Sequence, residues 1–212
     1  MRKALIVDDH PSIRMVLRMQ LEKVLGIATI EEAENGQVAI DYVRSEPFDL
    51  IVIDLDLPRI NGLELINRIH AMDPHIKLLV LSGQDEAVYA GRAMQAGAHG
   101  FVSKQNEMSE FVRAVELVLA GYSCFPQNLL LASRKGRPVE NVQAGSNLTD
   151  KELAILRYLA NGLSNKQISE RLFISNKTVS THKTRIMNKL KVSTLVELVD
   201  YARRNNITVI TE

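Results

Sequence analysis

The first 120 residues alternate short apolar runs with amphipathic stretches five times, and this repetition restricts the possible fold more than any other feature. Each apolar run has the length of a buried strand, and each following stretch spaces its apolar residues as a helix does. Strands and helices that alternate every 20–25 residues or so are typical of a parallel sheet covered by helices on both faces. We therefore predict an α/β, doubly wound (βα)5 domain with a parallel five-stranded sheet. The predicted strands are 3–7, 29–33, 50–53, 78–81 and 100–102, and the predicted helices are 12–25, 36–44, 62–72, 86–96 and 107–120.

Charge is divided unequally along the chain, although the chain as a whole has a net charge of only +1. Residues 1–124 contain 12 lysines and arginines against 18 acidic residues, whereas residues 143–212 contain 11 against 6. An acidic half joined to a basic half indicates two domains with different partners, and the basic half is a candidate for binding nucleic acid. We predict a first domain over 1–122, a linker rich in Gly, Pro and polar residues over 123–147, and a second domain over 148–212.

The sequence also indicates the cellular compartment. Cys124 is the only cysteine, which excludes an intrachain disulfide and a Cys-rich zinc module. No apolar run approaches the roughly 18 residues that a membrane span requires, and the N-terminus has no signal-peptide pattern. We therefore expect a cytoplasmic protein without a membrane partner.

Two neighbouring carboxylates, Asp8 and Asp9, follow the first predicted strand, and Asp54 follows the third. The first and third strands of a doubly wound sheet are neighbours, so the three carboxylates should meet at one edge. Their mutual repulsion calls for a cation, and a cluster of hard anionic oxygens suits Mg²⁺ or Mn²⁺. The sequence therefore predicts a divalent metal site at the carboxyl ends of the strands.

The last two strands add a hydroxyl and an ammonium group at the same edge, from Ser82 and Lys104. This set suits phosphoryl transfer to a carboxylate: Asp54 would attack phosphorus, Lys104 would neutralise a phosphoryl oxygen, and Ser82 could hydrogen-bond the product. A single strand-end aspartate, such as Asp8 or Asp56, is about as often the cap of a helix or turn. The occurrence of all these groups in order on successive strand ends favours a phosphoryl-transfer site.

Residues 3 to about 120 resemble the receiver domains of response regulators. The matching motifs are AspAsp at 8–9, AspLeuAspLeuPro at 54–58 with Gly62 four residues on, LeuSerGly at 81–83, and AlaGlyAlaHisGlyPheValSerLys at 96–104. The resemblance implies that Asp54 is the phosphoacceptor. It also implies that Mg²⁺ is bound by Asp9, Asp54 and the backbone carbonyl of Asp56, with Asp8 assisting through water. Ser82 and Phe101 would be the pair that rearranges on phosphorylation. Such a domain catalyses only its own phosphorylation and dephosphorylation.

The last 65 residues show only helical patterns. Thr149 and Glu152 form a capping-box signature, and Ser175 is a good N-cap for a helix over 176–190. One side of that helix offers hydrogen-bonding groups and cations without any acid, from Lys177, Ser180, Thr181, Thr184, Arg185 and Asn188. No acidic residue occurs between positions 173 and 195, which favours a DNA-binding face over an ordinary solvated one.

Residues 148 to about 207 resemble the LuxR/NarL-type helix-turn-helix, an all-α domain of four helices. The matching positions include Thr149, Glu152, Leu156, Gly162, Ser164-Asn165-Lys166, Ile168, Leu172, Ile174-Ser175, Thr178-Val179, His182, Ile186, Lys189-Leu190 and Val192. The resemblance implies that DNA bases are contacted by Ser180, Thr181 and Thr184. Phosphates would be contacted by Lys177, Lys183, Arg185 and Lys189. The final helix, 195–204, would serve dimerisation through Leu195, Leu198, Val199 and Ala202.

With both domains in this order, the whole chain resembles the two-component response regulators of the NarL/FixJ family. The segment GlyTyrSerCysPhePro at 121–126 adds a resemblance to the BvgA/EvgA-type virulence regulators among them. The implied partners are a sensor histidine kinase or histidine phosphotransfer domain, double-stranded promoter DNA, RNA polymerase, and a second copy of the chain after phosphorylation. Two alternatives remain. A DNA-binding regulator that ignores phosphorylation would not need the complete acidic set. A carboxylate phosphotransferase or phosphatase would not need the helix-turn-helix.

Overall fold

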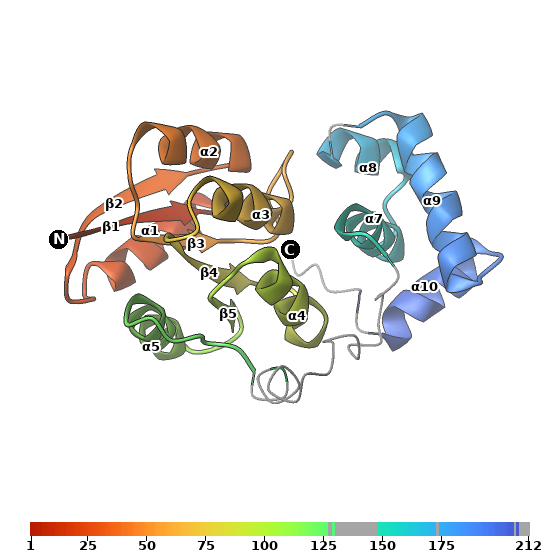
Figure 1. Ribbon diagram of the computed structural model, residues 1–212. Coiled ribbons are helices and arrows are strands. Elements are labelled where there is room, and N and C mark those ends of the chain that lie inside the picture. Colours follow the sequence, from red (N-terminus) through yellow and green to blue (C-terminus); the bar gives the residue numbers. More distant parts are fainter. Residues whose placement is uncertain (127–128, 130–147, 173, 206, 208–212) are drawn as a thin grey trace. The chain divides into compact units, whose positions relative to one another are not determined.

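The computed structural model describes residues 1–126, 129, 148–172, 174–205 and 207. The chain divides into two compact units, Met1–Lys135 and Gly136–Glu212 (Figure 1). Most of the predicted linker, 123–147, lies outside the described residues. No helix among the described residues is long and apolar enough to cross a membrane.

The first unit is built on a parallel sheet with strand order β2-β1-β3-β4-β5. Its strands are β1 Arg2–Val7, β2 Ile27–Ala33, β3 Leu50–Ile53, β4 Lys77–Ser82 and β5 Gly100–Ser103. This order confirms the predicted doubly wound sheet and makes the first and third strands neighbours. Val7 pairs with Ile53, so the residues that follow them, Asp8 and Asp54, leave the sheet side by side.

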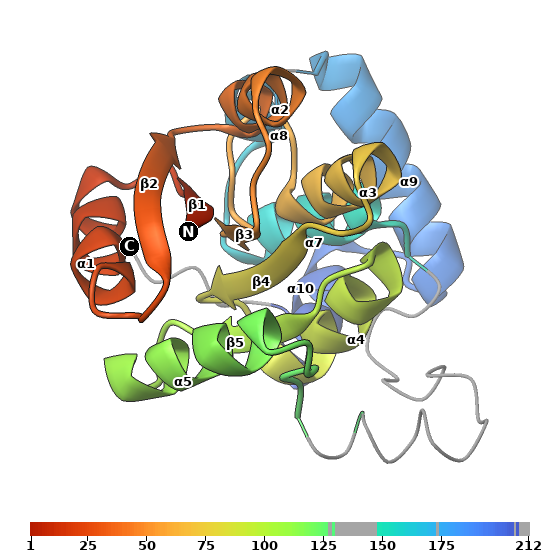
Figure 2. The same ribbon diagram turned by 60° about the vertical axis from the view of Figure 1, so that its left-hand side comes forward.

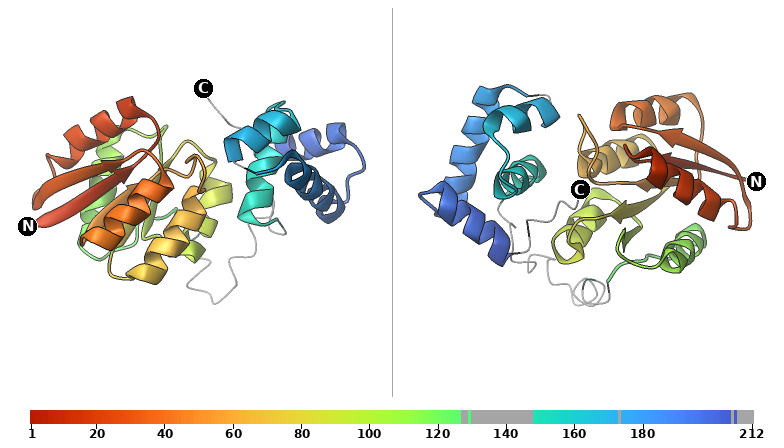
Figure 3. Two further views of the ribbon diagram at one scale, coloured as in Figure 1. Left: turned by 90° about the horizontal axis from the view of Figure 1, so that it is seen from above. Right: turned by 180° about the vertical axis from the view of Figure 1, so that it is seen from behind.

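Five helices among the described residues cover the two faces of this sheet. They are α1 Pro11–Leu21, α2 Gly36–Ser45, α3 Gly62–Met72, α4 Glu86–Ala96 and α5 Met108–Leu119. Helices α1 and α5 pack on one face, and α2, α3 and α4 lie on the other (Figures 2 and 3). The apolar stripes of α1 and α5 meet alternate strand residues in a core that includes Ile6, Val52, Leu81 and Phe111.

Helix α1 is shorter than predicted. It ends at Leu21 instead of residue 25, because the chain turns there and buries Val24 before β2 begins at Ile27. Apolar periodicity alone does not distinguish a last helical turn from a turn that also faces the core.

The chain returns to the sheet after α5 and pairs with the edge strand β5. Cys124 forms a parallel bridge with Gly100, and its carbonyl accepts the N–H of Phe101 at 2.8 Å. A side chain at position 100 would lie 2.9 Å from that carbonyl oxygen, so only glycine permits this close approach. Cys124, inside the predicted linker, is therefore still part of the packed first unit.

The described residues of the second unit form four helices, α7 Asp150–Ala160, α8 Asn165–Leu172, α9 Asn176–Leu190 and α10 Leu195–Arg204. Helix α7 packs against the other three and buries Leu153, Ile155 and Leu156 (Figure 1). The expected caps are present: Thr149 forms a capping box with Glu152, and the Ser175 hydroxyl accepts the N–H of Thr178 at 3.0 Å. These helices confirm the predicted all-α helix-turn-helix domain.

Candidate functional site

The carboxyl ends of β1 and β3 bring the predicted acidic residues together. One potential ligand atom from each of Asp8, Asp9, His10 and Asp54 lies within 4.8 Å of the others. Asp8 and Asp54 are 1% and 3% exposed, whereas Asp9 is partly open to solvent. Asp8 also accepts the N–H of His10 at 2.8 Å, so it serves as a turn cap in addition to lying in the cluster.

Lys104, from the loop after β5, completes this cluster. Its Nζ lies 2.7 Å from Asp8 Oδ2 and 2.9 Å from Asp54 Oδ2. Burial acts to lower the pKa of Lys104, but the charges of Asp54 and Asp8 outweigh it and raise that pKa. The lysine therefore carries a charge and partly compensates the two buried carboxylates.

The electrostatic balance around Asp54 is nevertheless unfavourable to its ionised form. Burial, aided by the neighbouring charges of Asp56 and Asp8, raises the pKa of Asp54 to about 6 despite the attraction of Lys104. Its Oδ1 is buried and has no hydrogen-bond partner among the described residues. A buried carboxylate whose Oδ1 has no hydrogen-bond partner, beside two further carboxylates, is a donor set that fits a divalent cation.

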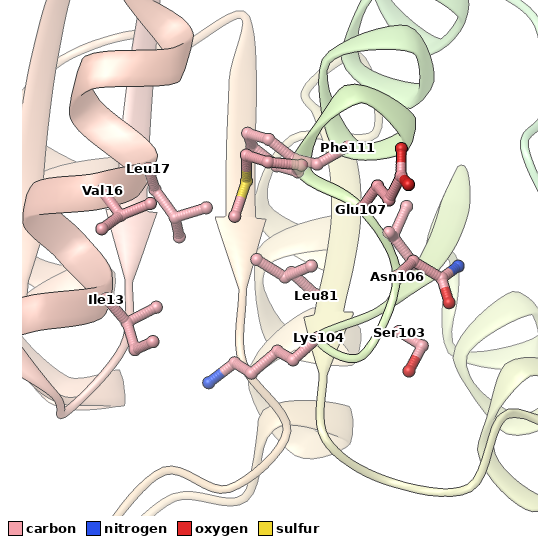
Figure 4. Close-up of a pocket in the computed structure, with 11 residues that line it drawn as sticks. Ile13, Val16, Leu17, Leu81, Ser103, Lys104, Asn106, Glu107 and Phe111 are labelled. Atoms are coloured by element: carbon pink, nitrogen blue, oxygen red, sulfur yellow. The ribbon is translucent and has the colours of Figure 1, made fainter.

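Lys104 also borders a small pocket between α1 and the start of α5. Figure 4 shows its ammonium group at the rim, pointing away from Ser103, while Ile13, Leu17 and Phe111 line the interior. The pocket holds about 50 Å³, far less than the roughly 300–1,000 Å³ of small-molecule sites. It is therefore much smaller than the usual site for an organic substrate.

The remaining predicted site residues of this unit lie nearby. Ser82 is fully buried at the end of β4, and its hydroxyl accepts the N–H of Gln84 at 3.2 Å. Phe101 is 4% exposed on the neighbouring strand β5, where it pairs with Val80. The side chain of Asp56 accepts a hydrogen bond from the Gln84 side chain.

Gly62 is required for the shape of the loop that carries Asp54. A Cβ at this position would lie 2.4 Å from the Asp54 carbonyl oxygen and 2.6 Å from Leu55 Cα. We expect Gly62→Ala to lower the free energy of unfolding by about 1–3 kcal/mol, because backbone must move to admit the methyl group. Gly83→Ala is the matched control, since a Cβ there meets nothing within 4 Å. Equal urea denaturation midpoints for the two variants would contradict this requirement.

Removing the charge of Asp54 should stabilise the metal-free protein. The folded-state pKa of about 6 lies above the ordinary value of 3.8, so ionisation at pH 7 disfavours folding. We expect Asp54→Asn to raise the free energy of unfolding by about 1–3 kcal/mol at pH 7 in EDTA. The gain should shrink as pH falls through 6 and vanish below about 4, where both states bind the proton. Denaturant titrations at several pH values measure it, with exposed Asp41→Asn as control; a gain independent of pH would contradict the cause.

The exposed side of α9 carries the predicted DNA-contacting groups. Lys177, Ser180, Thr181, Thr184 and Arg185 are exposed, and Lys183 is half-buried. Asn165 at the start of α8 donates from Nδ2 to the Ser180 hydroxyl at 3.1 Å, which ties the two helices of the motif together. Five of the seven predicted residues thus share an accessible, acid-free surface, and Lys183 is less exposed.

Lys189 differs from these six residues. Its ammonium group lies 2.6 Å from the buried carboxylate of Glu152, which also accepts the N–H of Thr149. Burial acts to raise the pKa of Glu152, but the bonds from Lys189 and Thr149 lower it overall. Lys189 thus forms an ion pair that joins α9 to the beginning of α7, and its predicted phosphate contact stays a prediction.

The four residues predicted for dimerisation on α10 differ in their exposure to solvent. Leu198 and Ala202 are 0% exposed and belong to the side of α10 that packs against α7, so they are unavailable to a second copy. Leu195 and Val196 are 43% and 70% exposed, and Val199 is half-buried. An amphipathic stripe predicts that a helix packs on something, but it does not say whether the neighbour belongs to the same domain.

Sequence reasoning missed several contacts of the site. Gln84 follows LeuSerGly but has no motif of its own, and only the fold brings it to Asp56. The sequence analysis gave His10 no role, but its Nδ1 lies 2.8 Å from Asp9 Oδ1. Its position directly after the two aspartates was the signal that could have identified it.

Comparisons with known proteins agree with both units. Residues 4–116 match the response regulator receiver domain, and residues 146–202 match the bacterial regulatory proteins of the luxR family. The fimbriae Z protein of Salmonella typhimurium is 41% identical over 203 residues, 96% of this chain and 97% of that protein. The virulence-factor transcription regulator BvgA of Bordetella pertussis is 41% identical over 209 residues, 97% of this chain and 98% of its own.

A solved structure of RcsB from Salmonella enterica serovar Typhimurium, bound to the promoter P1flhDC with phosphomimetic BeF3⁻, has a TM-score of 0.68 and 25% identity. The matched region covers 94% of this chain and 97% of the RcsB chain. The chain is therefore a response regulator, with a receiver domain followed by a LuxR-type regulatory domain. It belongs to the NarL/FixJ-type response-regulator transcription factors, as BvgA and the fimbriae Z protein do.

Proposed function

We propose that this response regulator accepts a phosphoryl group on Asp54, and that the phosphorylated protein dimerises and binds promoter DNA through α9. The observation that carries the proposal is the Asp54 carboxylate: it is buried, held on one oxygen by Lys104, and without a hydrogen-bond partner on the other oxygen beside Asp8 and Asp9. This is the arrangement that an acceptor for in-line phosphoryl transfer needs.

In the proposed step, one oxygen of the ionised Asp54 carboxylate forms a bond to the phosphorus of a phosphohistidine. The phosphorus–nitrogen bond breaks, and its electron pair returns to the imidazole of the donor, which is a sensor histidine kinase or a histidine phosphotransfer domain. Lys104, already 2.9 Å from Asp54, is placed to pair with an oxygen of the acyl phosphate, and the Ser82 hydroxyl can hydrogen-bond another.

Asp9, Asp54 and the backbone carbonyl of Asp56 would hold Mg²⁺, or Mn²⁺, with Asp8 bound through water. When bound, the cation offsets the negative charge of the carboxylates and of the incoming phosphoryl oxygens. The unpaired Oδ1 of Asp54 supports this assignment, because a buried carboxylate oxygen without a donor is costly unless a cation or a donor meets it.

Phosphorylation would act through Ser82 and Phe101. Lys104 and Ser82 are linked through backbone, since the N–H of Lys104 donates to the Ser82 carbonyl at 2.9 Å. Movement of Ser82 toward the phosphoryl group would vacate space beside β5, and Phe101 would rotate into it. Cytoplasmic location and contact with RNA polymerase are further parts of the proposal.

The proposed DNA interface is the exposed side of α9, with bases contacted by Ser180, Thr181 and Thr184 and phosphates by Lys177, Lys183 and Arg185. The promoter-bound RcsB structure, which shares the fold over nearly the whole chain, supports this assignment. We propose that Leu195, Val196 and Val199 form the α10 surface that meets a second copy, because they are its accessible apolar residues.

Lys104→Ala tests whether Lys104 binds the phosphoryl group while the carboxylates bind the metal. We expect the variant to bind Mg²⁺ at least as tightly as the parent, since the ammonium group no longer occupies Asp54 and Asp8. We also expect it to lose most of the phosphorylation-driven dimerisation, because the phosphoryl group has lost its cationic partner. Calorimetry measures the first effect, and light scattering with and without BeF3⁻ measures the second. Exposed Lys23→Ala is the control; a variant at Lys104 that dimerises like the parent would overturn the role.

A further inference from the structure

The exposed face of α9 offers fewer hydrogen-bond donors than its sequence suggests. The hydroxyl of Thr181 donates to the carbonyl oxygen of Lys177 at 3.0 Å, and the hydroxyl of Thr184 donates to that of Ser180 at 3.1 Å. A hydroxyl has a single proton. Both threonines are exposed, yet each has directed its only polar hydrogen to the preceding turn of its own helix.

This bonding also selects the group that each threonine presents to a partner. Threonine in a helix divides between two side-chain rotamers, because Oγ1 can bond the carbonyl one turn back. In the back-bonded rotamer, the other branch of the side chain is the methyl group, which has no polar bond to make. Thr181 and Thr184 are three residues apart, so the two branches lie on neighbouring parts of one helix surface.

The chemistry of base edges then limits what these residues can recognise. Guanine shows only acceptors, N7 and O6, in the major groove, and a hydroxyl whose proton is engaged cannot donate to them. Thymine shows a C5-methyl group, for which an apolar methyl is the matching partner. Ser180 differs from the two threonines, because its hydroxyl oxygen accepts a hydrogen bond from Asn165. Its own proton stays available for a base or phosphate acceptor.

We propose that Thr181 and Thr184 select thymine through their methyl groups, while their hydroxyl protons stay bonded to the helix. This inference rests on the proposed function, in which α9 lies in the major groove. Specificity at two positions of each half-site would then come from apolar contact with T·A pairs, and the surrounding lysines and arginine would add affinity without base choice.

Two pairs of variants separate the contribution of the methyl group to DNA binding from that of the hydroxyl. Thr181→Val and Thr184→Val keep a methyl in the same place and remove the hydroxyl, whereas Thr181→Ser and Thr184→Ser do the reverse. The preferred site is first selected from random duplexes with the full chain, phosphorylated by acetyl phosphate. Each thymine of that site is then replaced by uracil, which removes only the C5-methyl group.

We expect the valine variants to bind the selected site within about twofold of the parent, and the serine variants to bind it about three- to fivefold more weakly per methyl lost. Uracil at a contacted position should weaken the parent and the valine variants by the same factor. It should leave the serine variant at that position unaffected, because the contact is already absent. Ser180→Ala is the control: replacing thymine by uracil should weaken its binding by the same factor as it weakens binding of the parent.

Two results would overturn the inference: serine variants that bind like the parent while valine variants do not, or a selected site insensitive to uracil at every position. The second result leaves promoter binding intact if the site still outcompetes random DNA. If the parent shows no sequence preference at all, the proposed DNA-reading function itself fails, and this inference fails with it. Circular dichroism melts of all four variants show whether α9 is retained.

Discussion

Labelling by acetyl phosphate should fall to background when Asp54 is replaced by asparagine. The amide keeps the size of the side chain but lacks the nucleophilic, anionic oxygen that forms the acyl phosphate. No other carboxylate is expected to replace it, because Asp8 is engaged by Lys104 and by the N–H of His10. The measurement is intact-protein mass spectrometry at neutral pH, where a single added phosphoryl group marks the parent protein.

Asp56→Asn is the matched control for this result. Asp56 is two residues away, and only its backbone carbonyl is assigned a role, which asparagine retains. Its labelling should therefore remain within a few-fold of the parent. Labelling of the parent should also disappear in EDTA, since the carboxylates and the phosphoryl oxygens then repel without compensation. Undiminished labelling of Asp54→Asn, or full labelling in EDTA, would refute the assignment of the acceptor and of the metal.

Replacing Lys177, Lys183 and Arg185 together by alanine should weaken DNA binding about 10²- to 10³-fold at 0.1 M salt. Each phosphate contact contributes a slope of about −0.9 to the dependence of log K on log salt, so three lost contacts reduce the slope by almost three units. The loss should be nearly the same on specific and random duplexes, because phosphates carry no sequence information. Fluorescence anisotropy over a salt series measures affinity and slope together.

Lys166 and Lys191 provide the comparison for these cations. Both lie outside the proposed contact set, on α8 and after α9, so their double replacement removes charge without removing an assigned phosphate contact. A decrease in slope as large as that of the triple variant would mean that net charge, and not the face of α9, governs binding. Lys189→Ala should mainly lower stability, because it leaves the buried carboxylate of Glu152 without its cation.

The alternation of strands and helices was sufficient to predict the doubly wound sheet and the meeting of Asp8, Asp9 and Asp54. The reason is topological: in such a sheet the strand ends share one edge, so residues that directly follow a strand are placed without any knowledge of side-chain packing. Capping is equally local. Thr149, Glu152 and Ser175 were predicted as caps because a capping bond spans only three residues of chain.

The sequence by itself determined the strand ends, the caps, the acidic cluster and the acid-free side of α9, all of which depend on periodicity or on neighbours along the chain. Only the tertiary structure decided what the amphipathic faces touch. It buried Leu198 and Ala202 inside their own domain, paired Lys189 with Glu152 across 37 residues, and brought Gln84 to Asp56. It also engaged the protons of Thr181 and Thr184 within α9. The physical reason is that an apolar stripe or a charged side chain specifies the kind of partner it needs, whereas the packing of distant segments and the choice of rotamer specify which partner it meets.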